Sequence, residues 1–183
     1  LYSNQYFDLY NAKLENFVTS PYWAAASAIV AASVKDGYDN SVILGSSTEL
    51  SGAFRESSWG KSNPGSSDLD IEELTSGHAT VQTGIDGSLM WNMMALAEEP
   101  TSVKNDDGSL TYTIKVKDNL VFSDGSAITA KNYVAATLAN STEVSVAAGG
   151  TGISGMNFVG FEEFKAYTGE GNKVYFEGIK LID

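Results

Sequence analysis

The stretch DDGSLTYTIKVKDNLVFSDGSAITAKNYVAATL, residues 106–138, contains three local structural signals in a fixed order. Asp107-Gly108 supplies the pair of positive-φ positions that a tight hairpin turn requires. After this turn, Tyr112, Ile114 and Val116 alternate with polar residues at period two. This alternation predicts a strand with one buried face.

The same stretch predicts a second turn followed by a capped helix. Asp124-Gly125 marks the turn, and Thr129 stands where an N-cap is expected. Four residues after Thr129 recur at i, i+1, i+4 and i+5, a spacing that places them in one stripe along a helix with a 3.6-residue period. They are Tyr133, Val134, Thr137 and Leu138. We expect this helix to lie on the sheet to which the preceding strand belongs.

These segments resemble the extracellular solute-binding proteins of bacterial peptide-type (oligopeptide and dipeptide) ABC importers. The resemblance lies in YTIKV (112–116), VFSDG (121–125) and ITAKNYV (128–134). The family pattern there is a strand, then Phe-x-Asp-Gly, then Thr-Ala-x-Asp-hydrophobic. This chain has Asn132 where the family usually has Asp, and the uncharged Asn interacts less favourably with the helix dipole.

Fainter similarity extends to both sides. Residues 42–54 resemble the family's first strand and the ligand-side loop after it, and residues 158–183 resemble a Val-Gly-x-x-x-Phe helix and the next strand. From residue 41 onward, short elements separated by Gly, Asn, Asp and Ser predict an α/β (α+β) fold with a mixed, largely antiparallel sheet and packed helices. The resemblance implies that residues 41–183 would form the N-terminal portion of one lobe of a two-lobed, periplasmic-binding-protein-like clamp, which closes over its ligand by a hinge.

The resemblance also implies a function. The protein would capture a peptide or another small molecule for an ABC permease, without catalysis and without a cofactor or metal. It would be extracellular or at the bacterial cell surface, and membrane-anchored in full length, as a lipoprotein is. The second lobe of the same polypeptide would be missing here, so we expect very weak affinity for peptide from these residues alone.

Candidate ligand-binding residues come from two arguments. In the family, the loop after the first strand faces the cleft, which implies cleft-side positions for Thr48, Glu49, Leu50 and Ser51. Glu49 would accept the charged amine of a peptide through a charge-assisted hydrogen bond. Separately, Trp59 lies in a long loop and Trp91 near a strand end, where an indole can form a wall for a ligand, although each is more often a packing residue.

Bulk composition narrows the function classes. With 183 residues and 43% hydrophobic content, the chain is long and apolar enough for one ordinary domain with a core. A net charge of -12 repels phosphate backbones and anionic membrane surfaces, which argues against a nucleic-acid partner. The absence of cysteine excludes disulfides and thiolate chemistry.

Residues 1–40 are expected to form a helical extension that packs on the rest of the chain. They lack the basic and apolar regions of a secretory signal. The apolar run 22–34 is too short to cross a bilayer. Ser20 as a cap and Pro21 at the first helical position predict an Ala-rich helix there, apolar almost all round.

From residue 41 onward, short elements alternate with turn residues, and no internal repeat is predicted. We expect an apolar strand at 42–44, a long loop at 45–65 and an acidic helix at 69–76 capped by Asp68. Asp86-Gly87 is expected to join two further strands. Those strands are residues 79–83 and 88–92, and another strand is expected at 178–183.

Possible motifs for zinc binding, for a catalytic triad and for calcium binding lack the other residues that these sites require. His78 is alone, without cysteine for a closed zinc site and without a Gly-x-Ser-x-Gly elbow for a triad, so a half-exposed turn residue is expected. A calcium loop is not supported, because apolar residues interrupt the acidic set and its ligand spacing fails. That set is Asp68, Asp70, Glu72 and Glu73, which suits the first turns of a helix.

GTGISG at 150–155 matches G-x-G-x-x-G, and residues 143–148 are a candidate strand before it. A dinucleotide site requires a helix after the third glycine, and none is indicated, so a flexible glycine loop is the better interpretation. Two alternatives stay open. One is a self-contained carbohydrate-binding or adhesion module that uses Trp59 and Trp91, and the other is a hydrolase with paired acids.

Overall fold

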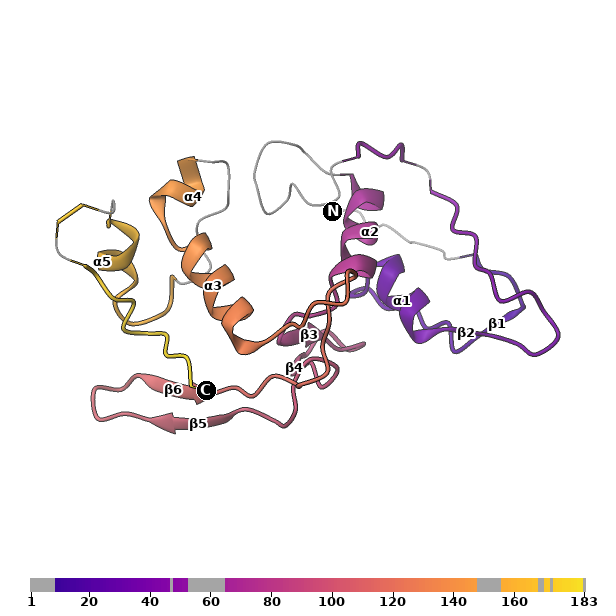
Figure 1. Cartoon of the computed structure of the whole chain (residues 1–183). Helices are drawn as coiled ribbons and strands as arrows, with labels where there is room; N and C mark the ends of the chain where they lie inside the picture. Colours follow the sequence, from indigo (N-terminus) through magenta and orange to yellow (C-terminus); the bar gives the residue numbers. More distant parts are fainter. Residues whose placement is uncertain are drawn as a thin grey trace, which may run out of the picture.

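The computed structural model describes residues 9–46, 48–52, 65–147, 156–167, 170–171 and 173–182. Within them the fold is α+β, as expected, with three antiparallel two-stranded sheets instead of one larger sheet (Figure 1). The helices are α1 (Ala25–Ala31), α2 (Ser66–Ser76), α3 (Ala130–Asn140), α4 (Glu143–Ala147) and α5 (Phe161–Lys165). The strands are β1 (Leu14–Glu15), β2 (Ser33–Val34), β3 (Val81–Thr83), β4 (Leu89–Trp91), β5 (Thr101–Lys104) and β6 (Leu110–Thr113).

The N-terminal part is built around α1, which packs against α2 and buries Ala26 and Ala28. The prediction of a helix over 22–34 was right in kind and wrong in its ends. Ser20 does not cap α1, because the helix begins at Ala25 with Ala24 as its N-cap. The Ser20 hydroxyl instead donates a hydrogen bond to the carbonyl of Ile85. At the other end, the helix stops at Ala31, since β2 follows at once and pairs with β1.

The N-terminal part is fastened to the β3–β4 hairpin by side chains. Besides the Ser20 contact, Trp23 Nε1 donates to the carbonyl of Thr83 over 3.1 Å. The Tyr22 ring lies against Gly87, so closely that a Cβ at this glycine would come within 2.8 Å of the ring. The expected packing of the extension on the rest of the chain therefore takes place at this hairpin and at α2.

One turn geometry occurs three times along the hairpins. In each copy the serine backbone N–H and hydroxyl both donate to Oδ1 of the aspartate, over 2.9 Å and 2.6–2.7 Å. The intervening glycine has a φ between 83° and 87°, the left-handed region that glycine adopts without steric cost. The copies are Asp86-Gly87-Ser88, Asp107-Gly108-Ser109 and Asp124-Gly125-Ser126. The Asp-Gly turns are thus confirmed in position, but the predicted pair of positive φ angles is wrong, because Gly108 has a positive φ and Asp107 does not.

A small core lies where the hairpins meet. Beyond β5 and β6, an isolated antiparallel bridge pairs Leu96 with Val116, through hydrogen bonds of 2.9 and 3.0 Å between Ala95–Ala97 and Lys115–Lys117. Leu96 in this bridge is fully buried. The side-chain amide of Asn92 donates to the carbonyl of Ala79 over 2.8 Å, which ties the core to the start of the β3–β4 hairpin.

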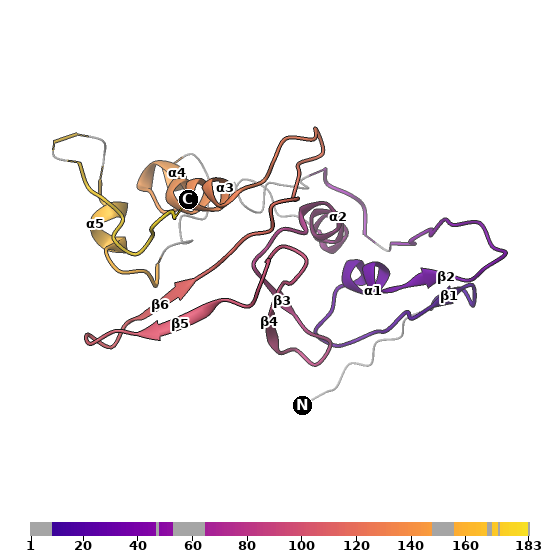
Figure 2. The same cartoon turned by 60° about the horizontal axis from the view of Figure 1, so that its bottom comes forward.

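The β5–β6 ribbon extends from this core to the side opposite α1 (Figures 1 and 2). The prediction of one buried face is wrong here, because both strands are exposed along their whole length. Tyr112 is 50% exposed and Ile114 is 42% exposed. A two-stranded ribbon without a second layer cannot bury either face.

Helix α3 begins at the predicted cap. The backbone N–H of Thr129 donates to Oδ1 of Asn132 over 2.8 Å, so the Asn132 amide oxygen completes a capping box. The predicted stripe is confirmed as the less exposed side of the helix. Its main neighbour is α4 rather than a sheet, and Tyr133 donates to the carbonyl of His78 over 2.7 Å.

The C-terminal part has its own aromatic cluster around Phe176. This ring stacks on Phe164 at 4.9 Å between centroids and meets Phe158 edge-on at 6.0 Å. Gly178 allows the chain to pass close by, since a Cβ there would lie 2.6 Å from Phe158 Cβ. Helix α5 lies where the Val-Gly-x-x-x-Phe pattern predicted one.

Three predicted strands are absent. Residues 42–44 and the described residues 178–182 pair with no strand, and residues 143–147 form α4. A strand needs a partner as well as an apolar sequence, and neither of the first two segments has one. Ile43 is consequently 93% exposed.

Candidate ligand-binding loop

The loop that was predicted to face a ligand is held by a buried carboxylate at the start of α2. Asp68 has no exposed surface. Its two oxygens accept hydrogen bonds from Ser51 N–H at 3.0 Å, Ser51 Oγ at 2.9 Å and Gly52 N–H at 3.2 Å. A further bond comes from Gly65 N–H at 2.8 Å. The carboxylate therefore joins the loop to the helix.

Asp68 is charged in this setting. Burial by itself raises the pKa of its carboxyl group, but the hydrogen bonds from Gly65, Ser51 and Gly52 lower it more, so that the pKa lies below its usual value of 3.8. The first turn of a helix also favours a negative charge. The predicted cap was wrong in position, because Gly65 is the N-cap and Asp68 reaches back to it from the third helical residue.

The other end of the loop is held by hydroxyl groups. Ser67 Oγ shares hydrogen bonds with both Ser46 Oγ and Thr48 Oγ1. Ser46 Oγ also accepts the backbone N–H of Thr48 over 3.2 Å. Since Ser67 is itself buried, this contact fixes the beginning of the loop as Asp68 fixes its end.

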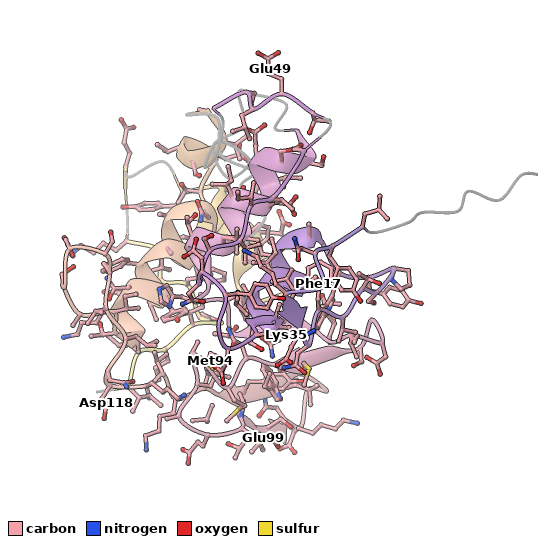
Figure 3. The ribbon with its side chains drawn as sticks, turned by 90° about the vertical axis from the view of Figure 1, so that its right-hand side faces the viewer. Phe17, Lys35, Glu49, Met94, Glu99 and Asp118 are labelled. Carbon is pink, nitrogen blue, oxygen red and sulfur yellow. The ribbon has the colours of Figure 1, made fainter. Side chains whose placement is uncertain are left out.

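The four predicted loop residues thus divide into two pairs. Thr48 and Ser51 use their side chains to anchor the loop. Glu49 and Leu50 lie between the anchors and are exposed, with Leu50 at 51%. Figure 3 shows Glu49 at one end of the molecule, pointing away from the other elements, while Glu99 lies at the opposite end. No described residue forms a hydrogen bond or an ion pair with the Glu49 carboxylate.

The two candidate tryptophans do not join this loop. Trp59 lies outside the described residues. Trp91 is half-buried in β4, and its ring meets Tyr112 edge-on at 6.2 Å. Strand β4 pairs with β3, which follows the C-terminal end of α2, whereas the loop is anchored at the N-terminal end of that helix. An 11-residue helix is about 16 Å long, so Trp91 and the loop belong to different surfaces.

Within the described ranges, the other sequence motifs form no second site. His78 is half-buried next to the end of α2, which agrees with the expected partial exposure. Of the acidic set, Asp70 accepts the N–H of Ala26 over 3.4 Å and Glu73 accepts the hydroxyl of Ser27, so both join α2 to α1. The described ranges hold no group of His, Asp and Glu side chains suited to a metal ion. The glycine motif at 150–155 lies outside those ranges.

Sequence reasoning missed one hollow in the N-terminal part. It has a volume of about 380 Å³, is open to solvent, and lies between the chain before α1 and Leu44-Gly45. Phe17 and Trp23 form aromatic walls, and none of the described lining residues is charged. The hollow is lined by segments that are distant in the sequence, so no local pattern predicts it.

In the part of the chain that the structure describes, no helix combines the length and the apolar character needed to cross a bilayer. Comparisons with protein-family models, curated proteins and solved structures found no match.

Proposed function

We propose that this chain is part of an extracellular solute-binding protein of a peptide-type ABC importer. In this role it captures peptide without catalysis and delivers it to an ABC permease. The location is the bacterial cell surface, with membrane anchoring in the full-length protein. The residues present form part of one lobe, and the second lobe of the same polypeptide supplies the opposite wall of the cleft.

The order of elements supports this proposal. Strand β6, the Asp124-Gly125 turn and the capped helix α3 follow one another as in the family that the sequence resembles. The departure at Asn132 does not disturb this order, because its amide oxygen completes the cap of α3. Helix α5 agrees with the fainter similarity downstream.

The observation that carries the proposal is the geometry of residues 48–51. Both ends of this loop are anchored to α2, while Glu49 between them is exposed and carries no ion pair with any described residue. A carboxylate on a fixed backbone suits the ammonium group of a peptide, since a charge-assisted hydrogen bond is stronger than a neutral one. Leu50 offers an apolar contact beside it.

A single wall of a cleft binds weakly. The closure step and the contacts of the second lobe are missing, so the loss of translational and rotational freedom is offset by few interactions. We therefore expect a dissociation constant in the millimolar range, which corresponds to about -4 kcal/mol. Tight binding by these 183 residues alone would contradict the half-site argument.

An NMR titration of the isotope-labelled chain with a short peptide, trialanine, tests the proposal. Weak binding with chemical-shift changes concentrated at residues 48–52 supports it. Submicromolar affinity, or unchanged loop signals at millimolar peptide, contradicts it. A parallel titration with an oligosaccharide covers the carbohydrate alternative, which predicts shifts around Trp91 and Tyr112 instead.

A further inference from the structure

We propose that Asp68 is a positioning residue that holds the loop at residues 48–52 in its ligand-ready conformation before any ligand binds. The inference rests on the proposed function, because it assigns a role to a residue that lies behind the candidate binding loop. Asp68 is fully buried, so it acts on the ligand only through the loop.

A carboxylate suits this position better than any other side chain. Oδ1 accepts the backbone N–H groups of Ser51 and Gly52, and Oδ2 accepts the Ser51 hydroxyl and the Gly65 N–H. An asparagine would keep one acceptor oxygen and place an amide NH₂ against donors, because its nitrogen cannot accept. The isosteric change Asp68→Asn therefore removes about half of the bonds without creating a cavity.

The contacts of Asp68 are divided between two tasks. The bond from Gly65 is local and completes the start of α2, three residues away. The bonds from Ser51 and Gly52 span 17 and 16 residues and serve no helix. Gly52 has a φ of 81°, so the loop turns sharply just where the carboxylate holds it.

Helix α3 provides the matched comparison within the same chain. It also has 11 residues, and its third residue, Asn132, also reaches back to the N-cap backbone. Beyond the bonds of the helix itself, Asn132 makes its hydrogen bonds to described residues with Thr129, so it caps a helix and fastens no distant described loop. Asn132→Ala is thus a control that weakens a helix start without touching residues 48–52.

Amide hydrogen exchange in the ligand-free chain tests the positioning role directly. In Asp68→Asn, exchange at Ser51 and Gly52 should accelerate at least about tenfold, the effect expected when hydrogen bonds to a charged group are lost. In Asn132→Ala, the same two amides should exchange as in the wild type. Unchanged exchange at Ser51 and Gly52 in folded Asp68→Asn would overturn the proposal.

Ser51→Ala keeps the experiment decisive if Asp68→Asn fails to fold. This variant removes the hydroxyl bond and leaves the backbone bonds, so exchange at Gly52 should accelerate less than tenfold but measurably. No acceleration at Gly52 in a folded Ser51→Ala chain would count against the positioning role in the same way.

Peptide titration then separates this role from the proposed function. If Asp68 positions the loop for ligand, Asp68→Asn should weaken trialanine binding about as much as Glu49→Gln, and the double variant should bind no more weakly than either. If the effects of Asp68→Asn and Glu49→Gln on trialanine affinity add fully in the double variant, the positioning role is overturned. A different result would be a wild-type chain that binds no peptide while amide exchange in the loop still depends on Asp68. That result would refute the proposed function and the ligand-related part of this inference. It would still support Asp68 as the residue that anchors the loop.

Discussion

The loop at residues 48–52 and the β5–β6 hairpin are both exposed, but they are held in different ways. Buried side chains of α2, Asp68 and Ser67, fix the loop through contacts that are distant in sequence. The hairpin is held by the local contacts of its own ladder and of the Asp107-Gly108-Ser109 turn, beside one edge-on ring contact between Tyr112 and Trp91. An exposed segment can therefore be anchored by buried polar groups beneath it, and a regular strand pair can still lack a core.

The hairpin's apolar residues sharpen this contrast. Val103, Leu110 and Tyr112 are each at least half exposed. A two-stranded ribbon that buries neither face is marginally stable in water. We therefore expect the hairpin to open more readily than the loop, and the following changes should affect one region without the other.

The largest effect should come from Leu96→Ala. Leu96 is fully buried at the base of the hairpin, and truncation of such a side chain costs about 2–5 kcal/mol. Denaturant unfolding followed by tryptophan fluorescence measures the loss. Leu110→Ala, at a site that is 54% exposed, should change stability by less than about 1 kcal/mol. Equal losses in the two variants would mean that the core does not lie at Leu96.

Gly108→Ala should weaken the hairpin alone, by about 1–2 kcal/mol. A Cβ at Gly108 meets no atom within 4 Å, so the cost comes only from its φ of 87°, which is unfavourable for residues with a side chain. Amide exchange along β5 and β6 should accelerate. Gly125→Ala carries the same backbone strain in the next turn and should leave β5 and β6 unchanged.

Ser67→Ala should loosen the loop by about 1 kcal/mol, the usual contribution of one neutral hydrogen bond. The hydroxyls of Ser46 and Thr48 lose their buried partner, so the Thr48 amide should exchange faster. Amide exchange in β5 and β6 should not change, because these strands are held by their own ladder, in which Ser67 takes no part. Faster exchange in both regions would remove the contrast between them.

The smallest effect should be a pH dependence of the hairpin turn. Hydrogen bonds from the Ser109 hydroxyl and N–H lower the pKa of Asp107 below 3.8. A lowered folded-state pKa means that this stabilisation is complete above about pH 3.8 and is lost as the pH falls through the folded-state pKa. NMR titration of the Asp107 carboxyl carbon should show the lowered pKa directly. In Ser109→Ala, the pKa of Asp107 should move back towards 3.8. An unchanged pKa in Ser109→Ala would rule out the hydroxyl as its cause.

The features that sequence predicted well depend on contacts within a few residues. The Asp-Gly turns rest on bonds between an aspartate and a serine two residues away. The cap of α3 joins Thr129 to Asn132, and the stripe behind it follows from helix geometry alone. Local signals of this kind do not depend on how the rest of the chain packs.

Features that depend on distant partners could not be predicted in the same way. The apolar segment at 42–44 has the composition of a strand, yet a strand also needs a neighbour, which composition does not specify. Asp68 was interpreted as a helix cap, because a first-turn acid usually serves the helix. Its bonds to Ser51 and Gly52 join positions 17 and 16 residues apart, and no local pattern in the sequence marks them.

The most direct test is to measure how Glu49→Gln changes the affinity for trialanine and for N-acetyl-trialanine. We expect the change to weaken binding of the free peptide about two- to fivefold, the range for an exposed ion pair, and to leave the acetylated peptide unaffected. Glu99→Gln, at the opposite end of the molecule, should alter neither. If Glu49→Gln affects both peptides equally, or neither, this loop does not receive the peptide amine.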